Sequence, residues 1–265
     1  MKIKMRDGVA LDCHRYGKGQ PVVLVHGFGG IQEIWVGQVS WLVAHGYEAI
    51  VYDQRNHGAS QPIAGPVQVM DLVQDLHDLI IQLHLKKPFL IGHSMGAGVV
   101  YGFLGYYPSF KLSGAMGIDQ PPKMLSNAEW PYGFLDVTDD NYRTNLLKKR
   151  KVHETLNGLD DRIWQRYHPA KKQKPFRLKE NLGLLVNEAR ADWRSALKHT
   201  QVDTLLVSSI QSPFFDYRFA EVMERLNPQH IHALAVEGAG HDVQAEIPDK
   251  FNQIMGAFLK NPATF

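Results

Sequence analysis

Short apolar runs bounded by turn residues recur along the chain, and they constrain its fold more than any other feature of the sequence. Within each run Val, Ile, Leu or Ala follow one another without regular alternation with polar residues. A strand that is buried on both faces has this composition, which is typical of a parallel sheet covered by helices on both sides. The runs that we interpret as strands cover residues 21–25, 48–52, 88–91, 114–118, 204–207 and 232–236.

The segments between these runs predict crossover helices and one insertion. Apolar residues at helical spacing predict an amphipathic helix over 69–83, which makes a strand, helix and strand unit with its neighbours. The interval from 120 to 203 is too long for a simple crossover. It holds helical patches at 141–151 and 179–198 and a basic stretch at 168–175 that we interpret as a surface loop. Because the strand pattern then resumes, we predict a helical cap insertion over 120–200 on an α/β core formed by 1–119 and 201–265.

Charge and cysteine content exclude several classes of function. The 265 residues carry a formal net charge of +2, which is too small to favour nucleic acid or an anionic membrane. The single Cys13 cannot form an internal disulfide, which suits a reducing compartment. Residues 1–8 lack the apolar region of a signal peptide, and no window approaches the ~18 apolar residues of a spanning helix. We therefore expect a cytoplasmic protein that binds neither nucleic acid nor membrane; the sequence gives no indication of its oligomeric state.

A G-x-S-x-G pattern stands directly after the third run. Gly92, Ser94 and Gly96 form it, and residues 97–100 begin a helix. A nucleophilic serine of this kind lies on a strained turn between a strand and a helix, where flanking glycines let neighbouring backbone approach closely. Strand, turn and helix are all predicted here in that order. We therefore predict that Ser94 is a catalytic nucleophile.

An acyl-transfer serine also needs donors for the oxyanion that forms on its substrate. The first run continues into a glycine-rich turn over 25–30, at the same edge of the predicted sheet as the serine. We predict that the backbone amides of Phe28 and Met95 are the oxyanion donors. His26, in the same turn, is predicted to support the loop through its ring nitrogens rather than to react.

The general base must lie far away in sequence. His241 follows the small-residue turn 238–240 after the last run, in the order of nucleophile and then histidine that this kind of elbow predicts. His230 and His232 offer two imidazoles to a metal, but no third ligand and no H-E-x-x-H motif accompany them. We predict that His241 is the base and that the protein uses no metal and no cofactor.

Together these segments resemble a known family. The turn 25–28, the stretch Asp53-Gln54-Arg55-Asn56-His57-Gly58, the elbow and the turn before His241 are similar to the α/β-hydrolase superfamily, and within it most similar to the metal-free haloperoxidases and perhydrolase-type serine esterases. The resemblance implies a mostly parallel eight-stranded sheet with helices on both faces, a helical cap and a triad of serine, histidine and acid. Asp53, Arg55 and His57 are then structural. Asn56 stands where the family usually has glycine. Among residues other than glycine, asparagine best tolerates a left-handed backbone.

The acid of this triad departs from the usual pattern. The family usually places it after the strand that precedes the histidine strand, and Ser212 stands at that position, with Asp216 four residues further on. A minority of members supply the acid from the end of the strand that follows the nucleophile, where this chain has Asp119. A neutral serine stabilises an imidazolium poorly, so we predict that Asp119 is the acid and keep Asp216 as the alternative.

These assignments predict a serine hydrolase that acts on a small-molecule acyl substrate, a small carboxylic ester or a related compound, through an acyl-enzyme intermediate. Two alternatives stay open. Hydrogen peroxide could intercept the acyl-enzyme to form a peracid, as the perhydrolase resemblance implies. The chain could also be a non-catalytic ligand receptor on the same fold, because such proteins exist in the superfamily.

Overall fold

A single twisted sheet forms the centre of the molecule in this computed structural model, which describes residues 1–148 and 151–265. Its strand order is β1-β2-β4-β3-β5-β6-β7-β8. All neighbours from β4 to β8 are parallel. Each of these strands overlaps one predicted run; they are β3 (Gln20–Val25), β4 (Tyr47–Asp53), β5 (Phe89–His93), β6 (Gly114–Ile118), β7 (Thr204–Ser209) and β8 (Ile231–Val236).

Two further strands complete the sheet at one edge and were not among the predicted runs. β1 (Lys2–Lys4) and β2 (Ala10–Gly17) are antiparallel to their neighbours. Only alternate side chains are buried along β1 and the first half of β2, among them Ile3, Leu11 and Cys13. Charged and polar residues fill the other positions, so no continuous apolar run marks these strands.

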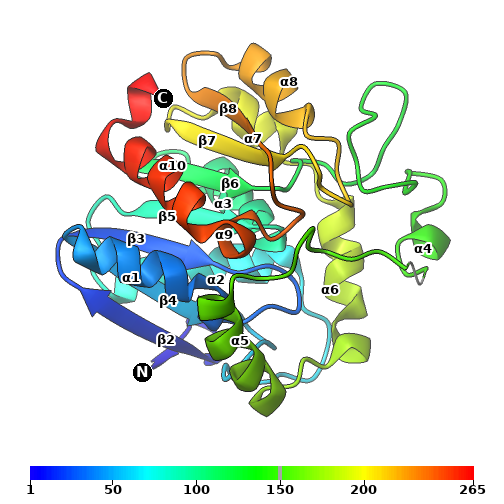
Figure 1. Cartoon of the computed structure of the whole chain (residues 1–265). Coiled ribbons are helices and arrows are strands. Elements are labelled where there is room, and N and C mark those ends of the chain that lie inside the picture. Colours follow the sequence, from blue (N-terminus) through cyan, green and yellow to red (C-terminus); the bar gives the residue numbers. More distant parts are fainter. Residues whose placement is uncertain (149–150) are drawn as a thin grey trace.

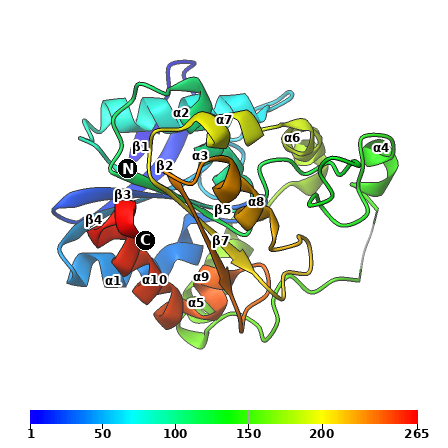
Figure 2. The same ribbon diagram turned by 90° about the horizontal axis from the view of Figure 1, so that it is seen from above.

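Helices cover both faces of the sheet (Figure 1), and the view from above separates the two layers (Figure 2). One layer contains α1 (Val36–Ala44), α9 (Val243–Glu246) and α10 (Pro248–Lys260), and it buries Trp35, Phe251 and Phe258 against the sheet. The other contains α2 (Val69–Gln82), α3 (Met95–Tyr106) and α8 (Phe219–Leu226). Within the described ranges, no helix has the length and apolar content needed to cross a membrane.

The segment between β6 and β7 contains α4 (Tyr142–Asn145), α5 (Asp161–Gln173), α6 (Leu178–Arg190) and α7 (Arg194–His199). Figure 1 shows α4 and α6 beyond the end of the sheet toward which the parallel strands point, whereas α5 packs its Ile163 in the same cluster as α1 and α10. The helix α7 lies within the range predicted as cap, but its Leu197 packs in the same cluster as α2 and α3. Of the helical patch predicted over 141–151, residues 149–150 lie outside the described residues, and α4 covers only its beginning.

The surface loop predicted over 168–175 was wrong. The helix α5 continues through Pro169 to Gln173, because Ala, Lys and Gln favour helix strongly enough to outweigh one internal proline. Just past its end, the Lys174 ammonium lies 2.7 Å from Oε1 of Glu33 and 3.6 Å from Oδ2 of Asp53. Through these ion pairs of Lys174 the basic stretch connects the inserted segment to the core.

The first turn of α3 rests directly on the end of β3. A Cβ added at Gly96 would overlap the carbonyl oxygen of Val25 and lie 2.7 Å from that of His26. A Cβ at Gly27 would lie 2.9 Å from the Cβ of Ser94. Only glycine permits this approach, which brings Ser94 beside the loop that follows β3.

We expect Gly96→Ala to lower the free energy of unfolding by about 1–3 kcal/mol or more, since rigid backbone, not a movable side chain, meets the new methyl group. Gly183→Ala is the matched control. Gly183 lies on the exposed side of α6 with nothing within 4 Å of an added Cβ, and alanine there should raise the free energy of unfolding by about 0.5–1 kcal/mol. Urea unfolding measures both changes, and equal effects would contradict the close approach.

Candidate active site

Ser94 occupies the turn between β5 and α3 in a strained conformation. Its φ of 53° and ψ of −129° lie where residues other than glycine are rare. The backbone holds the turn, because the Ser94 amide donates to the Ile118 carbonyl (3.0 Å) and the Ala97 amide donates to the Ser94 carbonyl (2.7 Å). The predicted elbow therefore forms, with a serine at the start of a helix.

His241 lies between β8 and α9, and one ring nitrogen meets a carboxylate. Its Nδ1 is 2.7 Å from Oδ2 of Asp119. An ionised carboxylate accepts but does not donate, so Nδ1 carries the proton and the lone pair of Nε2 is left to act as a base. The backbone amide of His241 donates to the carbonyl of Glu154 (2.7 Å), which connects the histidine loop to the inserted segment.

The electrostatic surroundings raise the pKa of His241. Burial by itself lowers the pKa of this imidazole, because charge is poorly solvated inside the protein. The hydrogen bond and negative charge of Asp119 act in the opposite direction, helped by the charges of Asp242 and Glu154. The sum is a pKa above the usual histidine value, as a base that must hold a proton during a reaction requires.

Asp119 stands at the end of β6, fully buried, with a φ of 46°. Its carboxylate accepts three hydrogen bonds, from the Ser209 amide (3.0 Å), the Ser212 hydroxyl (2.6 Å) and His241 Nδ1 (2.7 Å). A buried carboxylate with this many donors is stabilised as an anion. Ser212 stands at the position where the resemblance implies a carboxylate. In the structure its hydroxyl donates to Asp119 instead.

Asp216, the alternative acid, has a different partner. Arg218 donates to its Oδ1 from Nε (2.9 Å) and from its backbone amide (3.0 Å). The bond to Arg218 lowers the pKa of Asp216 even though burial opposes it. The geometry thus brings Asp119, not Asp216, into contact with His241.

Two other histidines next to the site are fixed as neutral supports. His26 donates from Nδ1 to the Gly27 carbonyl (2.8 Å) and accepts from the Gln54 amide at Nε2 (3.0 Å). His57 accepts from the Gly29 amide at Nε2 (3.0 Å). Burial lowers the pKa of His26 to about 4 and that of His57 to about 3. Both rings hold the loop after β3 in one conformation. In the adjoining turn Asn56 has a φ of 61°, the left-handed backbone that asparagine tolerates.

His93 occupies a variable position of the elbow and was not among the predicted site residues. In the structure its Nε2 donates to the carbonyl oxygen of His241 (2.9 Å), and the two rings lie 4.6 Å apart. Burial lowers the pKa of His93 to about 3, so it stays a neutral donor. In the sequence, its position next to Ser94 is the only feature that places His93 near the site. Among the described residues, no group of three His, Cys, Asp or Glu side chains is arranged to hold a metal ion.

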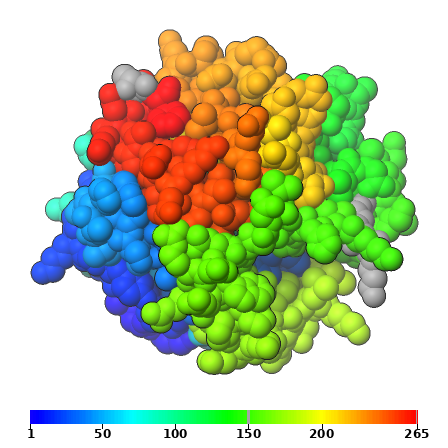
Figure 3. All heavy atoms as spheres, viewed as in Figure 1, coloured from blue at the N-terminus to red at the C-terminus, as the bar shows by residue number. Residues whose placement is uncertain are grey.

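A cavity of about 840 Å³ opens above Ser94 and His241. The loop after β3, the start of α3 and the inserted segment line it, with apolar walls from Phe134, Trp164 and Phe214. In the space-filling view the green segment that follows residue 151 lies against the orange-red C-terminal part (Figure 3), where the contact of Glu154 with His241 occurs.

The two predicted oxyanion donors belong to this cavity. Phe28 and Met95 both line it. In the part of the chain that the structure describes, neither backbone amide donates to another protein group. Both are therefore available to hold a negatively charged oxygen next to Ser94.

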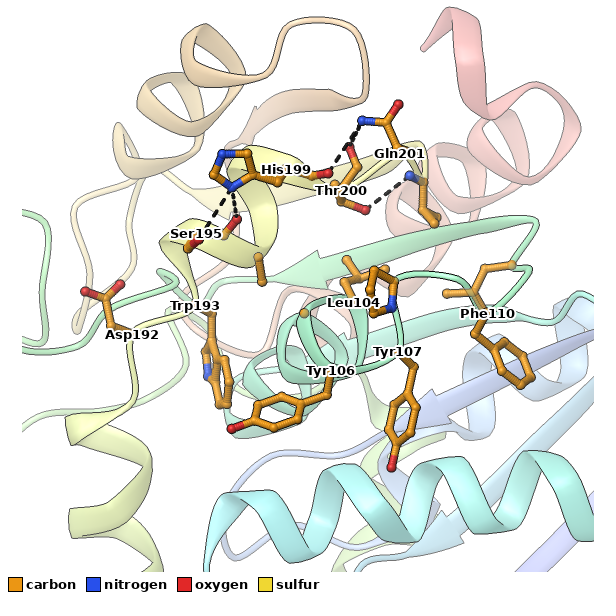
Figure 4. A pocket seen from close by; sticks show the side chains of 15 residues that line it. Leu104, Tyr106, Tyr107, Phe110, Asp192, Trp193, Ser195, His199, Thr200 and Gln201 are labelled. Carbon is orange, nitrogen blue, oxygen red and sulfur yellow. Dashed lines mark hydrogen bonds between the residues drawn. The ribbon is translucent and has the colours of Figure 1, made fainter.

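A second hollow, of about 500 Å³, lies between the end of α3 and α7 (Figure 4). It contains Asp192, Ser195 and His199, the residue types of a triad. However, His199 Nδ1 contacts the Ser195 carbonyl (2.9 Å) more closely than the Ser195 hydroxyl (3.4 Å), and Arg194 binds Asp192. All three triad-type residues are exposed, and their geometry does not assemble a nucleophile, base and acid.

Comparison with known proteins agrees with this architecture. The sequence profile described as Alpha/beta hydrolase family matches residues 22–254. The chain belongs to the alpha/beta hydrolase family. This membership and the eight-stranded, mostly parallel sheet confirm the predicted fold class.

Individual relatives include non-heme chloroperoxidases and a protein named as an AB hydrolase superfamily member. Non-heme chloroperoxidase CPO-A1 from Kitasatospora aureofaciens is 32% identical over 146 residues, 55% of this chain and 53% of that protein. The chain thus spans about half the length of the chloroperoxidase relatives that it matches. AB hydrolase superfamily protein YfhM from Bacillus subtilis (strain 168) is 25% identical over 96% of both chains.

Solved structures with the same fold include the esterase EaEST from Exiguobacterium antarcticum and a bromoperoxidase from Bacillus anthracis. The esterase has a TM-score of 0.81 at 22% identity, and the bromoperoxidase has 0.80 at 21%. Each match covers 98% of this chain and 99% of the other chain. At these identities the likeness concerns the fold.

We expect Asp119→Asn to lower the pKa of His241 by about 1–3 units, because the substitution removes the negative charge that opposes the effect of burial. An NMR titration of the imidazole C–H resonances measures the change. The matched control, Asp216→Asn, should leave the His241 titration in place. A shift in the control and none in Asp119→Asn would show that the charge acting on His241 comes from elsewhere.

Proposed function

We propose that the protein is a serine hydrolase that cleaves small carboxylic esters or related acyl compounds through an acyl-enzyme on Ser94. The observation that carries this proposal is the 2.7 Å hydrogen bond from Nδ1 of His241 to buried Asp119, because His241 and Ser94 line the same cavity. Family membership and esterase-type relatives of the fold support the same reaction class.

In the first half of the reaction, Ser94 Oγ attacks the ester carbonyl while His241 Nε2 takes its proton. The Phe28 and Met95 amides donate to the oxyanion, and Asp119 stabilises the imidazolium. Collapse of the tetrahedral intermediate breaks the C–O bond, and His241 gives its proton to the departing alcohol. The acyl group is then bonded to Ser94.

The second half repeats these steps with water. His241 takes a proton from water, which attacks the acyl carbonyl, and returns it to Ser94 Oγ as the carboxylic acid leaves. Apolar side chains such as Phe134 and Phe214 offer contacts to an acyl chain, and a volume of about 840 Å³ suits a small molecule. These steps use only groups of the chain itself.

Peracid formation is a second candidate because the chain resembles proteins named non-heme chloroperoxidase. Hydrogen peroxide would replace water as the nucleophile on the acyl-enzyme, giving a peracid and regenerating the Ser94 hydroxyl. Both reactions share the first half. The ratio of peracid to carboxylic acid formed from one ester in the presence of peroxide distinguishes them.

We expect Ser94→Ala to reduce ester hydrolysis to near background, because no other nucleophile replaces the hydroxyl. Loss of one hydroxyl group from a turn opens no core cavity, so the thermal unfolding curve should stay close to that of wild type. A fluorophosphonate probe with peptide mapping should label wild type at Ser94. Absence of labelling, or a ligand bound without turnover, would favour a receptor instead.

The acid assignment has its own test. Asp119→Asn should lower kcat by roughly 10³ to 10⁴, because an amide neither fixes the imidazole tautomer in the same way nor stabilises its cation. Asp216→Asn, whose carboxylate contacts Arg218, should cost less than about tenfold. Steady-state kinetics on a short aryl ester measures both, and the reverse order would overturn the assignment.

A further inference from the structure

Glu188 is one of the carboxyl residues that line the cavity without a role in the steps above. Glu188 lies on α6, is only 3% exposed and lines the same cavity as Ser94. Its Oε2 is buried without a hydrogen-bond partner in the described part of the chain. A buried polar group normally has a partner, and leaving one without it costs stability.

The position of this carboxyl is set by the helix that begins at the nucleophile. A Cβ added at Gly98 would overlap Oε1 of Glu188 and lie 2.9 Å from its Cδ, so the carboxyl packs directly on the α3 backbone. Gly98 follows Ser94 by four residues. Four residues of helix rise about 6 Å, so the Glu188 carboxyl lies at a distance of that order from Ser94.

Among the described residues no opposite charge offsets the effect of burial on Glu188, and burial raises the pKa of this carboxyl to about 8. Near neutral pH most molecules therefore carry a neutral carboxyl, which offers one O–H donor and one carbonyl acceptor. An alcohol offers the complementary acceptor and donor. An ammonium would form an ion pair here only after both ions lost their water, and such pairs gain little over neutral contacts.

We propose that Glu188 recognises a hydroxyl group on the ester that Ser94 cleaves, a few bonds away from the scissile carbonyl. The inference rests on the proposed hydrolase function and narrows its substrate class to hydroxylated esters. The substrate hydroxyl supplies a hydrogen-bond partner that the described part of the chain does not give to the Glu188 carboxyl. Glu188 is then a specificity-determining residue that forms no bond with the reacting atoms.

The experiment compares esters that differ only in a terminal hydroxyl or methyl group. One pair varies the alcohol part (3-hydroxypropyl acetate and butyl acetate), and the other varies the acyl part (ethyl 5-hydroxypentanoate and ethyl hexanoate). For wild type we expect kcat/KM to favour the hydroxylated member of one pair by about tenfold or more, because a site that binds a hydroxyl rejects an analogue without it.

Variants at position 188 separate recognition from structure. Glu188→Leu should remove most of the preference, whereas Glu188→Gln, which still donates and accepts, should keep it within about threefold. Glu188→Leu should also unfold at a higher temperature than wild type, since it removes an unpartnered buried polar group. Glu188→Met is a second apolar variant if the leucine variant does not fold. Glu180→Leu, an exposed position on the same helix, is the matched control and should keep the wild-type preference.

The outcomes distinguish the two proposals. Hydrolysis of both pairs with the same preference in wild type, Glu188→Leu and Glu188→Met overturns the hydroxyl assignment alone. A stronger preference for 3-(trimethylammonio)propyl acetate that disappears in Glu188→Gln also overturns it, because the occupant would then be a cation. Failure of wild type to hydrolyse any of these esters, together with no fluorophosphonate label at Ser94, overturns the hydrolase function and this inference with it.

Discussion

The buried carboxylate of Asp119 couples the ends of three neighbouring strands. It stands at the end of β6 and accepts hydrogen bonds from Ser209 on β7, from Ser212 in the loop after β7 and from His241 in the loop after β8. A buried carboxylate is destabilising unless donors of this kind satisfy it. The end of β7, the loop after β7 and the loop after β8 each supply one donor, so the conformations of all three segments depend on the same carboxylate. The same contacts that stabilise this edge of the sheet therefore also orient the histidine.

The core of the sheet could be predicted because its signal is local. Residues buried on both faces of a strand are mostly apolar, and β3, β4, β5, β6 and β7 each contain five or six successive buried positions with an apolar run among them. In β8, at the edge of the sheet, only Ile231 and Val236 are buried. The two antiparallel strands β1 and β2 carry no such signal, since only alternate residues such as Leu11 and Cys13 are buried. The helical continuation through Pro169 was also not predicted, because a run of basic residues such as 168–175 is typical of a solvated surface loop as well as of an exposed helix face.

The site shows the same division between local and distant information. Ser94, His241 and Asp119 each follow a predicted strand, and parallel strands bring their carboxyl ends to one edge, so their proximity could be predicted from the sequence. The contacts of Glu154 and Glu188 could not. Both belong to the segment between β6 and β7, whose path over the sheet depends on packing with residues far away in sequence, and nothing in their local pattern distinguishes them from surface acids.

Four buried histidines lie at the site, and a hydrogen bond to a carboxylate distinguishes His241 from the other three. Burial alone makes each imidazole a weaker base, and the pKa values of His26, His57 and His93 are lowered accordingly. These rings donate to neutral carbonyl oxygens, which cannot offset the loss of water around an imidazolium. His241 alone among the four donates to an ionised carboxylate, and its pKa rises instead of falling. Proton uptake in this cluster is therefore directed to the ring beside Asp119, while the neutral rings keep the backbone around it fixed.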